Sequence, residues 1–309
     1  MSVVIQDTFC KSALTKTGIP GADYAINPYT GCAHACVYCY ASFMTRFSGH
    51  TERWGTWVDL KTNVADVLEE EFCRKTARRR RAASRGAAAA PVQASLSGLG
   101  ETALPAAIDA LAPISILLSS VTDPYQPIEA SRGLTRACLE VLAGAEAGMI
   151  REVSVLTKSA LVARDIDLLQ SIPGSEVGFT ITTLDDAVAR RVEPGASAPS
   201  ARLEALERLA GRAIPTWVFI APVLPSVSDS PAALAALMKR AADAGASRIA
   251  VDRMNLYPAA VAGFRRVMPP EALADLSAYR SAPRLYADRL RAAVSEAAEG
   301  IKVPVRALF

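Results

Sequence analysis

Short apolar runs rich in β-branched residues recur from about residue 112 onward, and segments with apolar side chains at helical spacing separate them. The runs cover residues 114–118, 153–156, 177–181, 217–220 and 249–251. The helical segments cover residues 134–145, 161–169, 203–209 and 232–242. Strands that are apolar on both faces and separated by helices are typical of a parallel sheet covered by helices. The alternation therefore predicts an α/β fold built from repeated β-α units.

The residues before this repeat add another unit. A strand is expected just before Asn27, and residues 63–74 have the apolar periodicity of a helix that Asn63 caps. Six β-α units suit a partial or complete barrel, or an open doubly wound sheet. We expect the barrel over residues 25–260, between an N-terminal segment of residues 1–24 and a C-terminal helical extension of residues 261–309.

Residues 76–105 interrupt the repeat with four consecutive arginines, an alanine run, and then Gly, Ser and Pro, which predicts a flexible insertion. Seven basic residues and no acidic ones lie between residues 74 and 85. Elsewhere 27 basic residues face 31 acidic ones, so the net charge of +3 comes from this one stretch. The stretch is interpreted either as a solvated helix end or loop, or as a contact for a phosphate backbone.

Composition and hydropathy exclude two broad classes. Hydrophobic residues make up 51% and charged residues 21% of the 309 residues, which excludes wholesale disorder. No apolar run approaches the ~18 residues that a transmembrane helix needs, and residues 1–8 lack the features of a signal peptide. We therefore expect no membrane partner and a cytoplasmic protein whose thiols stay reduced.

Three of the six cysteines, Cys32, Cys36 and Cys39, form a C-x3-C-x2-C pattern. With cysteine at about 2% of positions, chance would produce this spacing with a probability of ~0.002. An iron–sulfur cluster usually has four cysteine ligands, so three close cysteines imply a cluster with one iron open to a ligand. A structural zinc site is the alternative, and His34 is then the candidate fourth ligand. The separate cysteines Cys73 and Cys138 lie in apolar helical patterns and are expected in the core.

Several segments beyond the cysteine loop match a known family. They are residues 11–14, 26–29, 121–129, 156–160, 180–183, 193–195 and 220–225. Together with a C-x3-C-x2-C loop whose last cysteine follows an aromatic residue, they resemble the spore photoproduct lyase-like branch of the radical S-adenosylmethionine (SAM) superfamily. The resemblance covers about residues 10–260. It implies a partial (β/α)6 TIM-like barrel of the radical SAM type.

In that superfamily, three thiolates bind a [4Fe-4S] cluster whose fourth iron chelates the amino and carboxylate groups of SAM. One-electron reduction, by a partner such as flavodoxin or ferredoxin, cleaves SAM to methionine and a 5′-deoxyadenosyl radical, which abstracts a hydrogen atom from the substrate. The resemblance therefore implies that Cys32, Cys36 and Cys39 bind the cluster. It also implies an enzyme, although the substrate is not identified by these residues.

The resemblance further implies SAM contacts at strand ends. Tyr38 and Ala221 would approach the adenine. Lys158 would contact the carboxylate or ribose, and Thr180, with Thr182 beside it, the ribose. The methionine end would be surrounded by Ser119, Ser120, Thr122 and Asp123. The alternative for the Ser, Thr and Asp residues is that they satisfy loop backbone, and for the lysine that it is solvated.

Two residues are predicted to be catalytic. Tyr40 is either a core aromatic or a hydrogen-atom relay next to the cluster, where photoproduct lyases have a tyrosine. Ser120 occupies the position at which those lyases have a cysteine hydrogen donor, and a serine O–H bond is too strong to give up hydrogen readily to a carbon radical. DNA-lesion repair is therefore an alternative, with DNA as one candidate partner, and a non-enzymatic iron–sulfur or zinc module is another.

Overall fold

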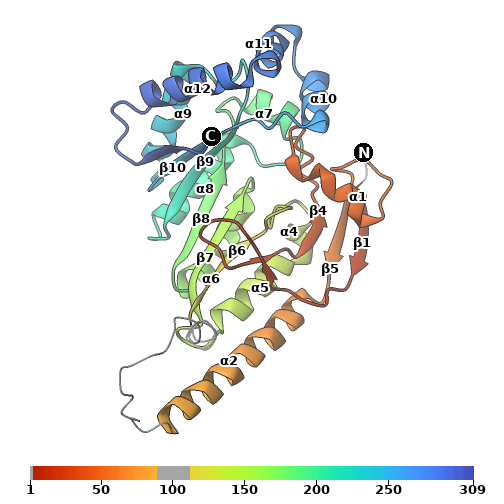
Figure 1. Ribbon diagram of the computed structural model, residues 1–309, viewed down its shortest axis with the longest axis vertical. Coiled ribbons are helices and arrows are strands. Elements are labelled where there is room, and N and C mark those ends of the chain that lie inside the picture. The colour runs from red at the N-terminus through yellow and green to blue at the C-terminus, as the bar shows by residue number, and fades with distance from the viewer. Residues whose placement is uncertain (1–2, 89–111) are drawn as a thin grey trace, which may run out of the picture.

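The computed structural model describes residues 3–88 and 112–309, and its main feature is an eight-stranded sheet in the order β11-β10-β9-β8-β7-β6-β3-β2. Every neighbouring pair from β3 to β11 is parallel, and β2 pairs antiparallel with β3. The strands are β2 (Thr15–Lys16), β3 (Tyr24–Ile26), β6 (Ile114–Leu118), β7 (Ile150–Thr157), β8 (Ser175–Thr180), β9 (Thr216–Val223), β10 (Ile249–Arg253) and β11 (Val305–Ala307). The six parallel strands β3 and β6–β10 confirm the predicted partial barrel (Figure 1).

Helices connect the parallel strands, as such strands require. From β6 to β10 they are α4 (Glu129–Arg132), α5 (Leu134–Ala143), η2 (Ala160–Asp165), α6 (Ile166–Ser171), α7 (Asp186–Val192), α8 (Pro199–Ala210) and α9 (Pro231–Asp243). The local sequence sets their starts. Ser230, for example, caps α9 by accepting a hydrogen bond from the Ala233 N–H, and Pro231 follows at the first helical position.

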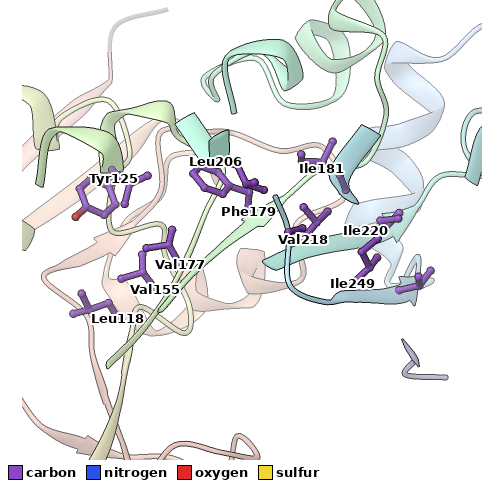
Figure 2. Packing of buried hydrophobic residues seen from close by; sticks show 14 of the residues in the cluster. Leu118, Tyr125, Val155, Val177, Phe179, Ile181, Leu206, Val218, Ile220 and Ile249 are labelled. Carbon is purple, nitrogen blue, oxygen red and sulfur yellow. The ribbon is translucent and has the colours of Figure 1, made fainter. Parts of the chain in front are cut away.

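The core lies between the strands and their helices. Val155, Val177, Val218 and Ile249 come from four successive strands, and each is at most 1% exposed. Leu206 of α8 lies next to Phe179 of β8 (Figure 2). The predicted apolar runs therefore form the centre of the sheet, because strands covered on both faces have no side chain left for solvent.

A second, three-stranded sheet lies beside the barrel and was not predicted. Its order is β1 (Val4–Thr8), β5 (Trp57–Lys61) and β4 (Tyr29–Gly31), with β1 parallel and β4 antiparallel to β5. The chain leaves β4 directly into the cysteine loop and continues through η1 (Tyr40–Met44) and α1 (Thr45–Ser48). The small sheet therefore anchors the start of the cysteine loop (Figure 1).

The helix that follows β5 is longer than expected. α2 spans Val64–Ala88, so the prediction that it ends near residue 74 and that a flexible insertion begins at residue 76 is wrong for residues 76–88. Residues 89–105 of the expected insertion lie outside the described residues. Asn63 directly precedes α2, as expected, and its carbonyl accepts the Val67 N–H at 3.0 Å. Its side chain pairs with the backbone N–H and carbonyl of Cys10, at 2.8 and 2.9 Å.

The chain after β10 forms α10 (Pro258–Val267), α11 (Pro270–Ser281) and α12 (Pro283–Ala297). It then returns to the sheet as β11, so the expected helical extension also contains a strand. Cys138 is buried as expected, whereas Cys73 is exposed. Among the described residues, no helix has the length and apolar character needed to cross a membrane.

Candidate functional site

The cysteine loop begins where β4 ends, and its three thiols lie close enough to affect one another. Burial raises the pKa of Cys32 to about 12, and the nearby charges of Asp123 and Cys39 act in the same direction. Burial also raises the pKa of Cys36 and of Cys39, although the Lys158 ammonium partly opposes both shifts. Buried thiols of this kind ionise readily only when a cation binds them. The donor set therefore fits a metal centre.

Glycines from three distant segments surround the loop. A Cβ on Gly55 would lie 2.6 Å from the Cβ of Ala35. A Cβ on Gly195 would collide with the backbone carbonyl of Ala33, and one on Gly263 with the carbonyl of Val37. The Gly195 N–H also donates to the His34 carbonyl at 3.0 Å. The loop is thus held by backbone contacts that leave no room for side chains. Of these glycines, the resemblance included only Gly195.

Asp123 ties the loop to the barrel. Its Oδ2 lies 3.3 Å from Nδ1 of the buried His34 and accepts the Lys158 backbone N–H at 2.8 Å. Its Oδ1 accepts the Thr157 hydroxyl at 2.7 Å and the Tyr125 N–H at 2.9 Å. Burial opposes ionisation, but the adjacent His34 ring and these donors hold the pKa of Asp123 at about 2. Both carboxylate oxygens are therefore occupied by protein donors.

Thr122 and Gln126 hold the start of the loop. The Thr122 hydroxyl donates to the Gly31 carbonyl at 2.6 Å, and the Gln126 amide oxygen accepts the Ala33 N–H at 2.8 Å. Gln126 is fully buried and its amide nitrogen donates to Thr122. Gln126 was within a matched segment but was not predicted as a site residue. Its position across the loop explains its presence in that segment.

Lys158 lies just after β7, and its side chain faces the cysteine loop. Its Nζ lies 6.0 Å from the centroid of the Tyr38 ring. Burial lowers the pKa of this ammonium, but the charges of Cys36, Glu193 and Asp123 raise it overall, so it remains protonated. No carboxylate among the described residues comes within 4.0 Å of it. The structure therefore brings Lys158, which has no ion-pair partner in the described part of the chain, close to Cys36 and Cys39.

Tyr38 and two threonines meet a buried ion pair behind the loop. Glu193 pairs with Arg202, and both side chains are fully buried. The Tyr38 hydroxyl donates to Glu193, as does the Thr182 hydroxyl at 3.2 Å. Arg202 also donates to the Thr180 carbonyl at 2.8 Å. The polar atoms of Tyr38 and Thr182 are thus already bonded within the protein, a pairing that the sequence did not predict.

The two predicted catalytic residues are in contact. The Tyr40 hydroxyl donates to the backbone carbonyl of Ser120, and Tyr40 is 48% exposed. Asn27, at the end of β3, accepts the Ser120 N–H at 2.9 Å and donates to its hydroxyl at 3.3 Å. The preceding residue, Ser119, has a positive φ of 66°, and its buried hydroxyl has no hydrogen-bond partner among the described residues. Ala221 lies on β9.

Trp54 is a site residue that sequence reasoning missed. It precedes Gly55, which packs against the cysteine loop, and its indole N–H is buried without a hydrogen-bond partner in the described part of the chain. The indole lies beside Cys39, where it favours the thiolate and lowers the pKa of that thiol against the larger effect of burial. Its N–H is therefore in a position to donate a hydrogen bond to the Cys39 thiolate.

Residues 3–88 and 112–309 contain no group of three Cys, His, Asp or Glu side chains close enough to bind one metal ion. A zinc site would place four ligands around a single ion, whereas a [4Fe-4S] cluster would take each thiolate on a different iron.

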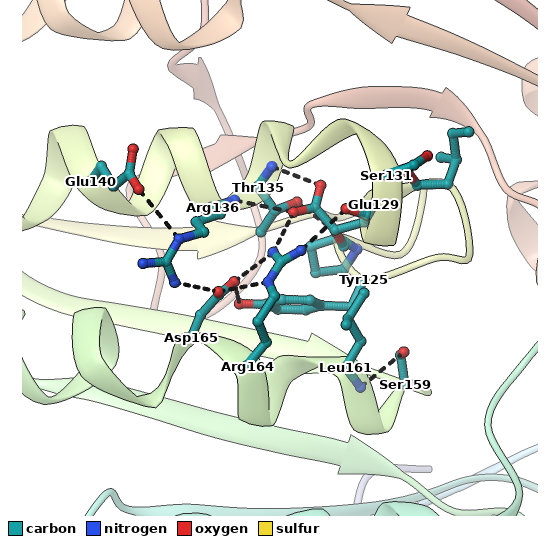
Figure 3. A network of polar contacts seen from close by, with 12 residues as sticks. Tyr125, Glu129, Ser131, Thr135, Arg136, Glu140, Ser159, Leu161, Arg164 and Asp165 are labelled. Carbon is teal, nitrogen blue, oxygen red and sulfur yellow. Dashed lines mark hydrogen bonds and ion pairs between the residues drawn. The ribbon is translucent and has the colours of Figure 1, made fainter.

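A buried charge network supports the segment that carries Thr122, Asp123 and Gln126 (Figure 3). Arg164 of η2 contacts Glu129 at 2.7 Å and Asp165 at 2.8 Å, and neither carboxylate is exposed. Arg136 of α5 reaches Asp165 at 2.7 Å, and the Tyr125 hydroxyl donates to Asp165 at 3.1 Å. Because each buried carboxylate has several partners, the network fixes this segment relative to η2 and α5.

No family model matches the chain. The uncharacterised protein MJ0683 of Methanocaldococcus jannaschii is 32% identical over 219 residues, which cover 71% of this chain and 67% of that protein. The uncharacterised protein Rv2578c of Mycobacterium tuberculosis is 31% identical over 266 residues, which cover 82% of this chain and 66% of that protein. The matched regions thus span about two thirds of the length of these relatives.

Solved structures of spore photoproduct lyase have a similar fold. One, a double mutant with bound AdoMet and dinucleoside spore photoproduct, has a TM-score of 0.62 and 16% identity, and the match covers 99% of this chain and 82% of that one. Another, complexed with the dinucleoside spore photoproduct, has a TM-score of 0.60 at 16% identity, with the same coverage. At this identity the similarity establishes the fold.

Proposed function

Since this chain belongs to one family with MJ0683 and has a fold similar to that of spore photoproduct lyase, we propose that it is a radical SAM enzyme of the spore photoproduct lyase-like branch. The observation that carries the proposal lies at the carboxyl edge of the parallel sheet, where three thiols are gathered with the Lys158 ammonium and the Ser119 hydroxyl. Within residues 3–88 and 112–309, the ammonium has no ion-pair partner and the hydroxyl has no hydrogen-bond partner. Ligands of α/β barrels bind at that edge.

Cys32, Cys36 and Cys39 would hold the cluster as thiolates, leaving one iron for SAM. Bound there, the cluster would supply the electron that cleaves SAM to methionine and a 5′-deoxyadenosyl radical. Lys158 faces the same space and would contact the SAM carboxylate or ribose through a charge-assisted hydrogen bond. Its charge would also offset the negative charge of the thiolates.

Ser119 would contribute a hydroxyl to the bound SAM. Its oxygen is buried and without a partner among the described residues, so a bound ligand would supply the missing hydrogen bond. By contrast, Asp123 and Thr122 already use their oxygens to hold the cysteine loop. We therefore expect their effect on SAM to act through the position of the loop.

Tyr40 and Ser120 would face the substrate side of the site. Tyr40 is half exposed and bonded to the Ser120 backbone, so its phenol is positioned to relay a hydrogen atom. The Ser120 hydroxyl is held by Asn27 and would orient substrate rather than donate hydrogen. DNA-lesion repair is not favoured for that reason, and the reductant would be a one-electron donor such as flavodoxin or ferredoxin.

Iron and sulfide analysis of the anaerobically reconstituted chain tests the cluster assignment. We expect about four irons per chain, the loss of the cluster in Cys39→Ala, and its retention in Cys73→Ala, because Cys73 is exposed on α2. The same preparations are then assayed for 5′-deoxyadenosine after addition of SAM and reductant. A chain that binds one zinc ion and no iron would refute the proposal.

A further inference from the structure

A cavity of about 530 Å³ lies between α10 and α11, outside the residues assigned to the cluster and SAM. On α10 it is lined by positions 258, 261, 262, 265 and 266, which form one continuous face of a helix. The face is apolar in its first half, at Pro258, Val261 and Ala262, and carries Arg265 and Arg266 in its last turn. The cavity is therefore apolar at one end and positively charged at the other.

The charged end is not neutralised within the protein. Arg280 of α11 joins Arg265 and Arg266 in lining the cavity, and no acidic residue lines it. In the described part of the chain, none of the three guanidinium groups forms an ion pair with a carboxylate. Positive charge in the last turn of a helix is favoured by the helix dipole. That preference does not explain why three arginines from two helices meet at one cavity.

The cavity lies on a different face of α10 from the cysteine loop. α10 (Pro258–Val267) follows the carboxyl end of β10. Gly263 packs directly on the carbonyl of Val37 in the cysteine loop, and it does not line the cavity. With 3.6 residues per helical turn, Ala262 and Arg265 in the middle of the lining face point away from Gly263. A ligand held by the arginines would therefore bind apart from the cysteine loop.

We infer that this cavity binds the phosphate group of a phosphorylated ligand whose apolar part lies against Val261 and Pro258. This binding site is separate from the proposed radical SAM site. Three guanidinium groups suit a phosphate dianion better than they suit a single carboxylate, because each guanidinium offers paired N–H donors and the phosphate has more oxygens to accept them. The apolar half of the α10 face suits an aromatic or aliphatic group next to that phosphate.

Phenyl phosphate is the probe, and its binding to the reconstituted full-length chain is measured by calorimetry. We expect binding that weakens at least tenfold in Arg265→Gln/Arg280→Gln. The control Arg132→Gln/Arg284→Gln removes two exposed arginines that do not line the cavity, and its affinity should stay within twofold. All four substituted side chains are exposed, so the fold should be retained, and this is checked by thermal unfolding.

Two further ligands test the class of compound. Inorganic phosphate should bind more weakly than phenyl phosphate if the apolar end contributes, and benzoate should bind more weakly if the site selects phosphate. Equal affinity for either ligand, equal weakening in both double variants, or no binding of phenyl phosphate would overturn the inference. Because this assay requires neither SAM nor reduction, its failure is distinct from a failure to cleave SAM.

Discussion

The Nδ1 atom of His34 lies 3.3 Å from Oδ2 of Asp123, which joins the centre of the cysteine loop to the end of the β6 segment. His34 is the residue first considered as a fourth zinc ligand, and here it is buried against a carboxylate. The Asp123 carboxylate receives two further donors from the end of β7, at Thr157 and Lys158. One carboxylate thus positions the loop against two strands of the barrel.

Replacing this carboxylate should destabilise the chain. Asp123→Asn removes a group whose pKa is about 2 in the folded protein and 3.8 ordinarily, which corresponds to about 2 kcal/mol. Because the folded pKa is lowered, the stabilisation is present above pH 4 and is lost as the pH falls toward 2. Urea unfolding of the cluster-free chain at several pH values measures it. A loss in Asp123→Asn that is unchanged between pH 7 and pH 2 would contradict this account.

Gly195 should tolerate no side chain. A Cβ there would overlap the Ala33 carbonyl, so Gly195→Ala must displace the cysteine loop at a cost of about 1–3 kcal/mol. We expect lower iron content after reconstitution and a lower melting temperature. Gly18→Ala is the matched control, since a Cβ at Gly18 meets nothing within 4 Å. Similar iron content in the two variants would show that the close contact does not hold the loop.

The sequence predicted the elements that have a local apolar pattern and missed those whose structure depends on distant residues. The strands of the barrel are continuous apolar runs, so residues 114–118 were predicted with the bounds observed for β6. Four of the five residues of β1 are exposed, and the strand has no apolar periodicity. Its partner β5 lies about fifty residues away in the sequence, so neither β1 nor its pairing could be predicted from the local sequence. The Arg-rich half of α2 likewise lacks an apolar face that would have indicated a helix.

The site was predictable to a similar degree. The cysteine spacing is local, and Tyr40, Ser120 and Lys158, which the resemblance singles out, lie in one region of the fold. The bond from Tyr38 to Glu193 joins residues 155 positions apart and could not be inferred from spacing. The close approach of Gly55 to the loop, and with it the position of Trp54, also depends on tertiary packing.

Lys158→Gln should separate SAM binding from cluster binding. The substitution removes a cation that faces the thiols and has no carboxylate partner among the described residues, while leaving a side chain of similar length. We expect about tenfold weaker SAM binding, which is the lower end of the range for a charge-assisted hydrogen bond, with unchanged iron content. Lys11→Gln, at an exposed position, is the control. SAM affinity equal to that of the unmodified chain would show that Lys158 makes no such contact.

Trp54→Phe should change the reduction potential of the cluster. Its indole N–H lies beside Cys39. Hydrogen bonds to cluster sulfurs stabilise the reduced cluster, which carries more negative charge, so their loss lowers the reduction potential. We expect retained iron and a more negative midpoint potential, by roughly 59 mV for a tenfold change in a one-electron equilibrium. Trp217→Phe removes an equally buried indole N–H on β9 and should leave the potential unchanged. Identical potentials in both variants would argue against a role for Trp54.

Formation of 5′-deoxyadenosine tests the central claim most directly. The anaerobically reconstituted chain is mixed with SAM and a strong one-electron reductant, and the products are separated by chromatography. The account predicts 5′-deoxyadenosine and methionine from the unmodified chain and from Cys73→Ala, and neither product from Cys39→Ala. A chain that carries four irons, is reduced, and still leaves SAM intact would contradict it.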